Sequence, residues 1–256
     1  MHHRLILPSH QKQSGKVLAL LFFLLACSTI SAKELIISTS KSIPPYIINE
    51  TESGLQIDRV RKAFQLAGYH IQKIIFTSNK RAEQLLLEHK VDAIINAPPI
   101  PNIYLSEPVV YFHNVAVTLV SSNITLRNLS DLRSHRIMAF QNAIKFLGEE
   151  YRQLMASHLR YDEAVNQNAQ LRRLFSGQID VIILDKRIFE YYHQQLIEQD
   201  RHTQPVKFHY LFEPAPRRLG FYNQTLRNEF NGGLSQLNQA ENRPQMNNNV
   251  QKIHPK

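Results

Sequence analysis

The sequence has very little cysteine: one residue, Cys27, among 256. Cys27 lies within the first 32 residues, which we expect to be removed, so the mature chain should hold neither a disulfide nor a thiol nucleophile. The chain also lacks a GxSxG motif, a P-loop and a GxGxxG motif. No two of its histidines have the spacing of a zinc motif, so we predict neither a metal nor any other cofactor.

Acidic residues are absent from the first 32 positions, which have the composition of a secretory signal peptide. Basic residues precede an apolar run and then small residues, in the order Arg4, Lys12, Lys16, Val17–Ala26 and Ser28–Ala32. The apolar run is shorter than the about 20 residues of a membrane-spanning helix. We therefore predict cleavage after Ala32, a mature chain that begins at Lys33, and a soluble periplasmic protein.

A lipoprotein is the alternative to a freely exported protein. Leu24 to Cys27 resembles a lipoprotein box, in which Cys27 would be lipidated and retained. We favour cleavage after Ala32, because Ser28–Lys33 would be a short tether in front of a strand that starts near Leu35.

The mature chain lacks a clustered basic face. Three of the 30 basic residues and none of the 21 acidic ones lie in the leader, and the remaining basic residues are scattered. Nucleic-acid binding requires a basic patch with interleaved aromatic residues, so we predict no nucleic-acid partner. No second long apolar run follows the leader, so we expect no membrane span in the mature chain.

The stretch from Leu171 to Asp185, LRRLFSGQIDVIILD, predicts a helix that ends at Gly177 and a buried strand at Ile179–Leu184. Asp185 then stands at the carboxyl end of that strand, where ligands bind in open α/β sheets. The same pattern occurs at Val91–Ile95, because VDAII aligns with IDVII. The repeat predicts two α/β lobes of similar build with a cleft between them.

Apolar periodicity ahead of VDAII predicts the order βαβαβ, and hence a parallel, right-handed sheet. We predict lobe 1 from residues 33–114 and 208–240, lobe 2 from residues 115–207, and a polar, flexible tail at 241–256. Three further elements are predicted: a helix from Asn142 to about His158, a strand near Leu159–Tyr161 and a final helix over Asn223–Leu237.

Several short motifs occur in a fixed order along the mature chain: PPY at Pro44–Tyr46, GxxID at Gly54–Asp58, Arg81, VDAII, SEP at Ser106–Pro108, IDVIILD, and FNGGL at Phe230–Leu234. This set resembles the solute-binding proteins of family 3, type II periplasmic-binding proteins typified by the polar amino-acid binding proteins of ABC importers. The resemblance implies an α/β fold of two lobes, each a mostly parallel sheet flanked by helices, joined by two crossing strands and closing over a solute.

The sequence departs from this family at the usual carboxylate clamp. Amino-acid binders of the family carry a TxxR motif shortly before SEP, whereas Pro99–Tyr104 contains no arginine. Phe140–Ala143 also replaces the usual helix start rich in glycine and threonine. These departures therefore argue against a standard α-amino acid as the ligand.

Six side chains at strand ends, loops and helix starts are predicted to bind the ligand: Tyr46, Arg81, Asn96, Gln141, Asn142 and Asp185. Asp185 would accept a cationic group, as the acid of the second lobe does in the family, or would instead cap the following helix. Tyr46 would form an aromatic wall or pack at the edge of a lobe. Arg81 would reach the cleft or pair with Glu83 or Asp92, and Asn142 could be both an N-cap and a contact.

We therefore predict a monomeric solute-binding protein, not an enzyme, that captures a small polar solute in a cleft between its lobes for the membrane permease of an ABC importer. The solute is expected to be amino-acid-like or another small amine or carboxylate. A periplasmic sensor that passes ligand state to a membrane partner is one alternative. A dehydratase-like enzyme on the same fold is another, because the architecture can support acid–base chemistry.

Overall fold

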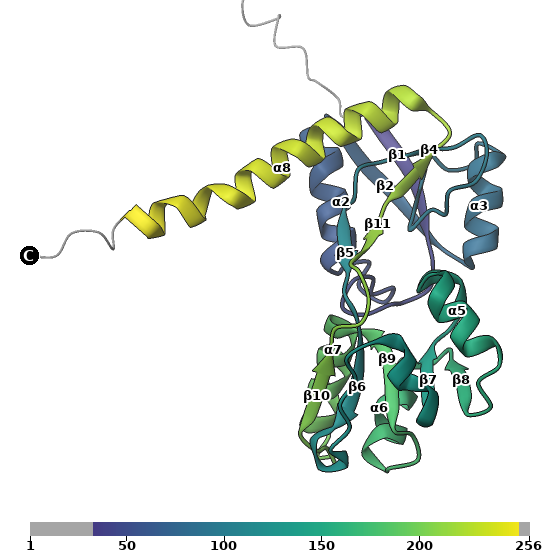
Figure 1. The fold of residues 1–256 in the computed structure, drawn as a ribbon. Coiled ribbons are helices and arrows are strands. Elements are labelled where there is room, and N and C mark those ends of the chain that lie inside the picture. Colours follow the sequence, from purple (N-terminus) through teal and green to yellow (C-terminus); the bar gives the residue numbers. More distant parts are fainter. Residues whose placement is uncertain (1–32, 251–256) are drawn as a thin grey trace, which may run out of the picture. The chain divides into compact units, whose positions relative to one another are not determined.

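The computed structural model describes the backbone of residues 33–250 and the side chains of residues 33–242 (Figure 1). The predicted leader, with Cys27 and the cleavage site after Ala32, lies outside the described residues. Within residues 33–250, no helix combines the length and the apolar composition needed to span a membrane.

The first lobe is built on a five-stranded sheet in the order β2-β1-β3-β12-β4. β1 and β3 are parallel, with Ile37 opposite Ala93, and β12 runs antiparallel to both of its neighbours. The strands are β1 (Lys33–Thr39), β2 (Tyr69–Phe76), β3 (Ala93–Ile95), β4 (Tyr104–Leu105) and β12 (Leu219–Phe221). The helices are α2 (Leu55–Leu66), α3 (Asn79–Leu87) and α8 (Gln224–Val250).

The second lobe is built on another five-stranded sheet, in the order β10-β6-β9-β7-β8. β7 is parallel to both β8 and β9, whereas β6 is antiparallel to β9 and β10. The strands are β6 (Asn114–Leu119), β7 (Ile137–Phe140), β8 (Tyr161–Ala164), β9 (Val181–Asp185) and β10 (Val206–His209). The helices are η1 (Val120–Ser122), η2 (Leu129–Ser134), α4 (Ala143–Phe146), α5 (Glu149–Ala156), α6 (Gln167–Phe175) and α7 (Lys186–Glu198).

Two strands that belong to neither large sheet carry the chain between the lobes. β5 (Val110–Phe112) leads into β6, and β11 (Ala215–Arg217) leads back into β12. They lie side by side as an antiparallel pair with Phe112 opposite Ala215 (Figure 1). The predicted pair of crossing strands is confirmed.

The repeated aspartate has the same structural role in both lobes. Asp92 accepts a hydrogen bond from the backbone N–H of Ile36, at 2.8 Å, and Asp180 accepts one from the backbone N–H of Arg136, also at 2.8 Å. In each case the aspartate N–H also donates to the carbonyl of the same partner residue. Both acids therefore have a structural role, because each holds the backbone of a neighbouring strand.

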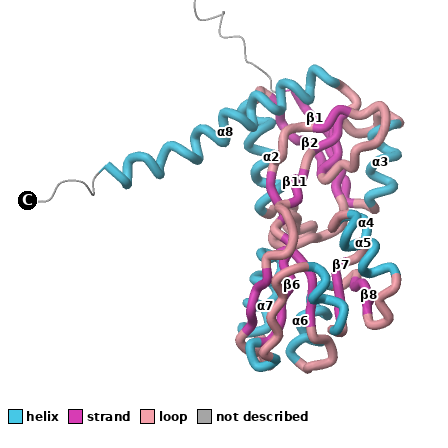
Figure 2. The backbone as a smooth tube through the Cα atoms, in the orientation of Figure 1, coloured by secondary structure: helices cyan, strands magenta, loops and turns pink. Residues whose placement is uncertain are grey.

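Three predicted elements differ from the observed ones. The helix predicted from Asn142 to His158 is two helices, α4 and α5, because Gly148 between them has φ 93° and cannot continue a helix. The strand predicted at Leu159–Tyr161 is β8, at Tyr161–Ala164. The final helix does not end near Leu237 but continues as α8 to Val250, into the segment predicted to be a flexible tail (Figure 2).

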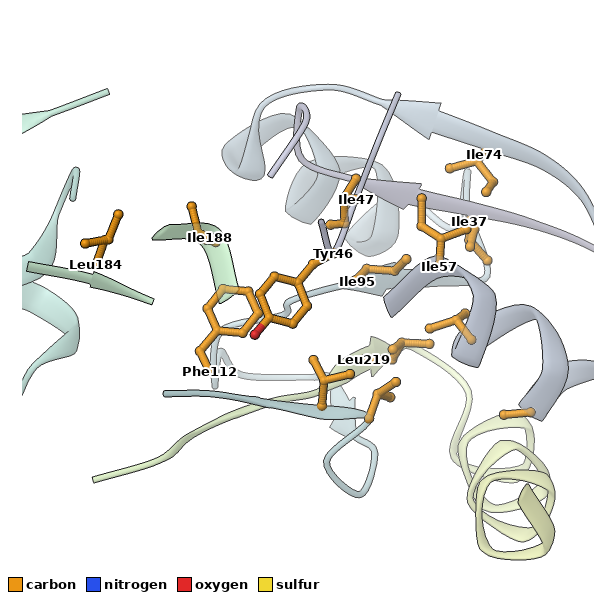
Figure 3. Packing of buried hydrophobic residues seen from close by; sticks show 14 of the residues in the cluster. Ile37, Tyr46, Ile47, Ile57, Ile74, Ile95, Phe112, Leu184, Ile188 and Leu219 are labelled. Carbon is orange, nitrogen blue, oxygen red and sulfur yellow. The ribbon is translucent and has the colours of Figure 1, made fainter. Parts of the chain in front are cut away.

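One buried cluster includes side chains from both sheets and from the connection between them. Ile37 and Ile95 come from the first sheet, Leu184 comes from the second, and the rings of Tyr46 and Phe112 lie between them (Figure 3). The two rings stack with centroids 4.2 Å apart. The loop with Tyr46 is therefore fixed against a crossing strand.

Candidate functional site

A cavity of about 500 Å³ lies at the carboxyl ends of parallel strands from both lobes. Ligands bind at this position in open α/β sheets, and a cavity of this size fits a small solute. Its first-lobe residues follow β1, β2 and β3, and are Ser40, Lys41, Ser42, Ile43, Thr77, Ser78, Asn79 and Asn96. The remaining lining residues are Phe112, Asn114, Phe140, Gln141, Asn142, Phe146, Ala164, Val165, Gln167, Asp185, Ile188 and Arg217.

Asn96 contributes to this cavity from the first lobe, as predicted. It follows β3 in a left-handed conformation, with φ 60°, which asparagine tolerates better than most residues. Its side-chain oxygen accepts a hydrogen bond from Nε2 of the buried Gln56, at 2.8 Å. Because that bond uses the oxygen, the amide NH₂ of Asn96 is the group that could donate to a solute.

Asp185 lies at the end of β9, with 2% of its surface exposed, and caps α7. Its Oδ1 accepts hydrogen bonds from the backbone N–H groups of Arg187 and Ile188, at 2.9 and 3.1 Å. Oδ1 also accepts one from the Tyr46 hydroxyl, at 3.0 Å, and Oδ2 accepts one from the backbone N–H of His113, at 2.7 Å. The capping role is therefore present, and the carboxylate also borders the cavity.

The environment of Asp185 opposes its ionisation in one respect and supports it in another. Burial raises the pKa of Asp185, whereas its three backbone donors and the Tyr46 hydroxyl lower it, with a net upward shift. Burial and the nearby carboxylate in turn raise the pKa of Tyr46, which therefore remains a neutral donor. The hydrogen bond from Tyr46 to Asp185 links the two lobes directly.

Gln141 and Asn142 follow β7 and border the cavity, as predicted. Asn142 precedes α4 with φ 62°, but its side chain makes no capping hydrogen bond, so the N-cap interpretation of that side chain is wrong. The backbone N–H groups of Asn142 and Ile144 donate to the carboxylate of Glu163, at 2.6 and 3.1 Å. These two backbone donors at the start of α4 are thus used by an internal carboxylate.

Two predicted site residues do not border the cavity. The side chain of Arg81 is exposed, and its backbone N–H is the group that bonds the capping Ser78 of α3. Neither predicted partner pairs with it: the described residues contain no ion pair from Arg81 to Glu83 or Asp92. Tyr46 is fully buried, so the packing alternative holds for this ring.

Sequence reasoning missed the two cations and the central amide of the cavity. Lys41 comes from the loop after β1, Asn114 begins β6 with 3% exposure, and Arg217 ends β11. Arg217 belongs to a pair of adjacent arginines that looked like scattered surface charge. No signal in the sequence distinguishes Arg217 from Arg218, because only the crossing-strand geometry turns one towards the cavity and pairs the other with Glu107.

The cavity can bind and orient a solute through mixed polar and aromatic contacts. No group of three or more His, Cys, Asp or Glu side chains that could hold a metal ion occurs among the described residues. A second hollow of about 560 Å³ lies entirely in lobe 2, beside η2 and α5. Because it is lined by one lobe only and contains none of the six predicted residues, we do not place the site there.

Several solved structures have a fold similar to that of this chain. The ligand-binding core of GluR0 in complex with L-glutamate aligns with a TM-score of 0.63 and 15% identity, over 81% of this chain and 93% of that chain. A histidine kinase sensor domain with similarity to periplasmic binding proteins gives 0.63 and 15%, over 83% and 93%. The arginine-, lysine-, histidine-binding protein ArtJ from Geobacillus stearothermophilus gives 0.60 and 13%, over 88% and 97%.

No protein-family model matches the sequence, and no curated protein does so. At identities of 13–15%, the structural matches establish the fold and nothing finer. The predicted two-lobed type II periplasmic-binding-protein fold is confirmed, with two mixed α/β lobes joined by two crossing strands.

Proposed function

We propose that this chain is an exported, non-enzymatic solute-binding protein that captures a small polar solute between its lobes. The cavity carries this proposal, because it is formed where parallel strands of both sheets end and is lined from both lobes. A solute in that place contacts both sheets at once and favours the conformation in which both sets of contacts exist. Solved structures of the same fold include amino-acid complexes, which supports a small amine or carboxylate as ligand.

The cleft residues favour binding over catalysis. Asp185, the one carboxylate among the described residues that line the cavity, accepts four hydrogen bonds and caps a helix. A general base must be able to approach and accept a substrate proton, and this carboxylate has little free capacity to do so. We therefore propose that the solute leaves the protein unchanged.

A thermal-shift screen of small polar metabolites tests the proposal. A solute at about 100 times its dissociation constant adds about 2.7 kcal/mol to the free energy of unfolding. For a chain of this length that corresponds to an increase in melting temperature of about 5–10 °C. The proposal expects at least one such solute, recovered unchanged by NMR after incubation. A folded protein that no solute stabilises, or a stabilising solute that is converted, would overturn it.

We also propose delivery to the permease of an ABC importer rather than to a sensor. Both kinds of domain occur among solved structures of this fold. Adjacent genes for a permease and an ATPase, together with uptake of the screened solute that is lost when this gene is deleted, would support delivery. Unchanged uptake in the deletion strain would contradict it.

A further inference from the structure

Arg217 is a cation of the cavity that forms no ion pair among the described residues. It lines the cavity from the end of β11, partly buried. Within the described residues its guanidinium makes no hydrogen bond or ion pair, and its buried Nε atom has no hydrogen-bond partner. A buried unpaired donor costs free energy, and a charged one costs more, so a ligand acceptor at this place would stabilise the protein.

Aromatic rings fix the guanidinium of Arg217. Its central carbon lies 4.2 Å from the centroid of Phe112, which itself stacks on Tyr46, and 5.8 Å from the centroid of Phe146. Cation–π contacts use the faces of a guanidinium and leave the N–H groups at its edge for hydrogen bonds. Phe112 and Phe146 thus hold a planar donor in place without using its donors.

The balance of charge around the cavity favours an anion. Among the described residues that line it, Arg217 and Lys41 are the two cations and Asp185 is the one acid. Asp185 attracts Arg217 through space, but its oxygens already accept hydrogen bonds from Tyr46 and three backbone N–H groups. The formal excess is one positive charge, which matches a single carboxylate better than a dianion such as phosphate.

The other place where an anion would be expected is already filled. The N–H groups of Asn142 and Ile144 receive the carboxylate of Glu163. Lys41 is exposed and flexible, so the fixed Arg217 is the stronger anchor.

We infer that Arg217 binds the carboxylate of a small organic acid, and that an ammonium group on the solute is not required. The inference rests on the proposed function and names the class of its ligand. A carboxylate accepts two parallel hydrogen bonds from the edge of a guanidinium, which gives both affinity and orientation. Because the donors around Asp185 already satisfy it, recognition depends less on a solute cation than on Arg217.

Three probes of equal chain length separate the charges of the ligand: pentanoate, 5-aminopentanoate and 1,5-diaminopentane. Each is titrated by calorimetry into the parent at the same ionic strength, together with every hit of the screen and with inorganic phosphate. We expect carboxylates among the binders and no binding of the diamine. A set of hits that consists only of cationic or uncharged solutes, or phosphate binding tighter than every carboxylate, overturns the inference but leaves solute binding in place.

Arg217→Met keeps much of the apolar stem and removes the charge. Loss of one partner of a desolvated charge pair should weaken carboxylate binding about 30-fold or more. Arg217→Lys, which keeps the charge but not the planar edge, should give an intermediate loss and serves if the methionine variant does not fold. Arg218→Met is the matched control, since Arg218 donates to the Ser106 carbonyl outside the cavity and should leave affinity within about twofold of the parent.

Parent-like carboxylate affinity in both Arg217 variants overturns the inference, while the proposed function stands. If no solute of the screen binds the parent, the proposed function is wrong and this inference is wrong with it.

Discussion

Asp185 shows how one side chain can complete the fold and border the site at the same time. It receives four hydrogen bonds, and one of them comes from Tyr46 of the other lobe. Asp185→Asn replaces one carboxylate oxygen with an NH₂ group, so whichever oxygen is lost, at least one buried donor loses its acceptor. We expect the free energy of unfolding to fall by about 1–3 kcal/mol.

Chemical denaturation of the Asp185→Asn variant checks this expectation. The control is Glu213→Gln, in which the acid is exposed and a change within about 0.5 kcal/mol is expected. Unchanged stability in Asp185→Asn would show that these four hydrogen bonds do not hold the lobes or the start of α7.

The contribution of Asp185 to the free energy of unfolding should also depend on pH. Burial raises the pKa of Asp185, so between its ordinary value near 3.8 and the raised value the folded state holds more protons than the unfolded state. The contribution of Asp185 to stability therefore increases as pH falls through that window. Asp180 is the opposite case, because its hydrogen bonds with Arg136 lower its pKa and its contribution is lost as pH falls towards the lowered value.

The free energy of unfolding of each asparagine variant and of the parent, measured across acidic pH, distinguishes the contribution of Asp185 from that of Asp180. The stability advantage of the parent over Asp185→Asn should grow as pH falls towards about 4, and its advantage over Asp180→Asn should shrink below about 4. Equal pH dependence in the two variants would contradict a raised pKa at Asp185 together with a lowered pKa at Asp180.

For individual residues, the sequence predicted those cavity residues that follow strand ends and missed those that the crossing strands position. Asn96, Gln141 and Asp185 border the cavity, because a residue that follows a parallel strand lies at the ligand-binding edge of its sheet. Arg217 could not be found in the same way. Its position depends on the pairing of β11 with β5, two segments about a hundred residues apart.

Among the elements, α2 and α8 pack against each other, and a glycine makes their close approach possible. A Cβ atom built on Gly233 would lie 2.1 Å from the carbonyl oxygen of Ala63 in α2. Gly232 is its neighbour in α8, and a Cβ atom there would meet nothing within 4 Å. The two adjacent glycines therefore provide a matched pair of substitutions with opposite expected signs.

Gly233→Ala should push the helices apart and lower the free energy of unfolding by about 1–3 kcal/mol, as overpacking does. Gly232→Ala should raise it by about 0.5–1 kcal/mol, because alanine favours the helix. Urea denaturation of both variants decides between the two effects. If both are equally stabilising, α8 does not pack on α2 through Gly233.

Most elements were predictable, and the break between α4 and α5 is the clearest of the three differences. The repeated aspartate in VDAII and IDVII predicted two similar units, and Asp92 and Asp180 make the same backbone hydrogen bonds. The break between α4 and α5 was missed because Ala143, Leu147 and Leu154 continue an apolar pattern across Gly148. A periodic pattern constrains the buried face, and a positive φ at one glycine can still end the helix.

For the whole molecule, the two sheets form two lobes, and strands of both sheets end at the same cavity. The sequence predicted this architecture because the alternation of strands and helices occurs twice, and the solved structures confirm the fold. The sequence could not identify the solute, since Lys41, Asn114 and Arg217 come together only after both lobes have formed.

The most direct test of solute capture between the lobes asks whether a bound solute contacts both of them. Lys41 and Gln141 line the cavity from opposite lobes, are exposed, and make no side-chain hydrogen bond or ion pair among the described residues, so their removal should not disturb the fold. Lys62, exposed on α2 and absent from the cavity, provides the control. The measurement is calorimetric titration of the best solute of the screen into Lys41→Ala, Gln141→Ala and Lys62→Ala.

We expect Lys41→Ala and Gln141→Ala each to weaken binding about threefold to tenfold, because each loses one hydrogen bond or charge contact, and Lys62→Ala to bind like the parent. If Lys41→Ala and Gln141→Ala both bind the solute with the affinity of the parent, the solute is not held between the lobes and the proposed function is wrong.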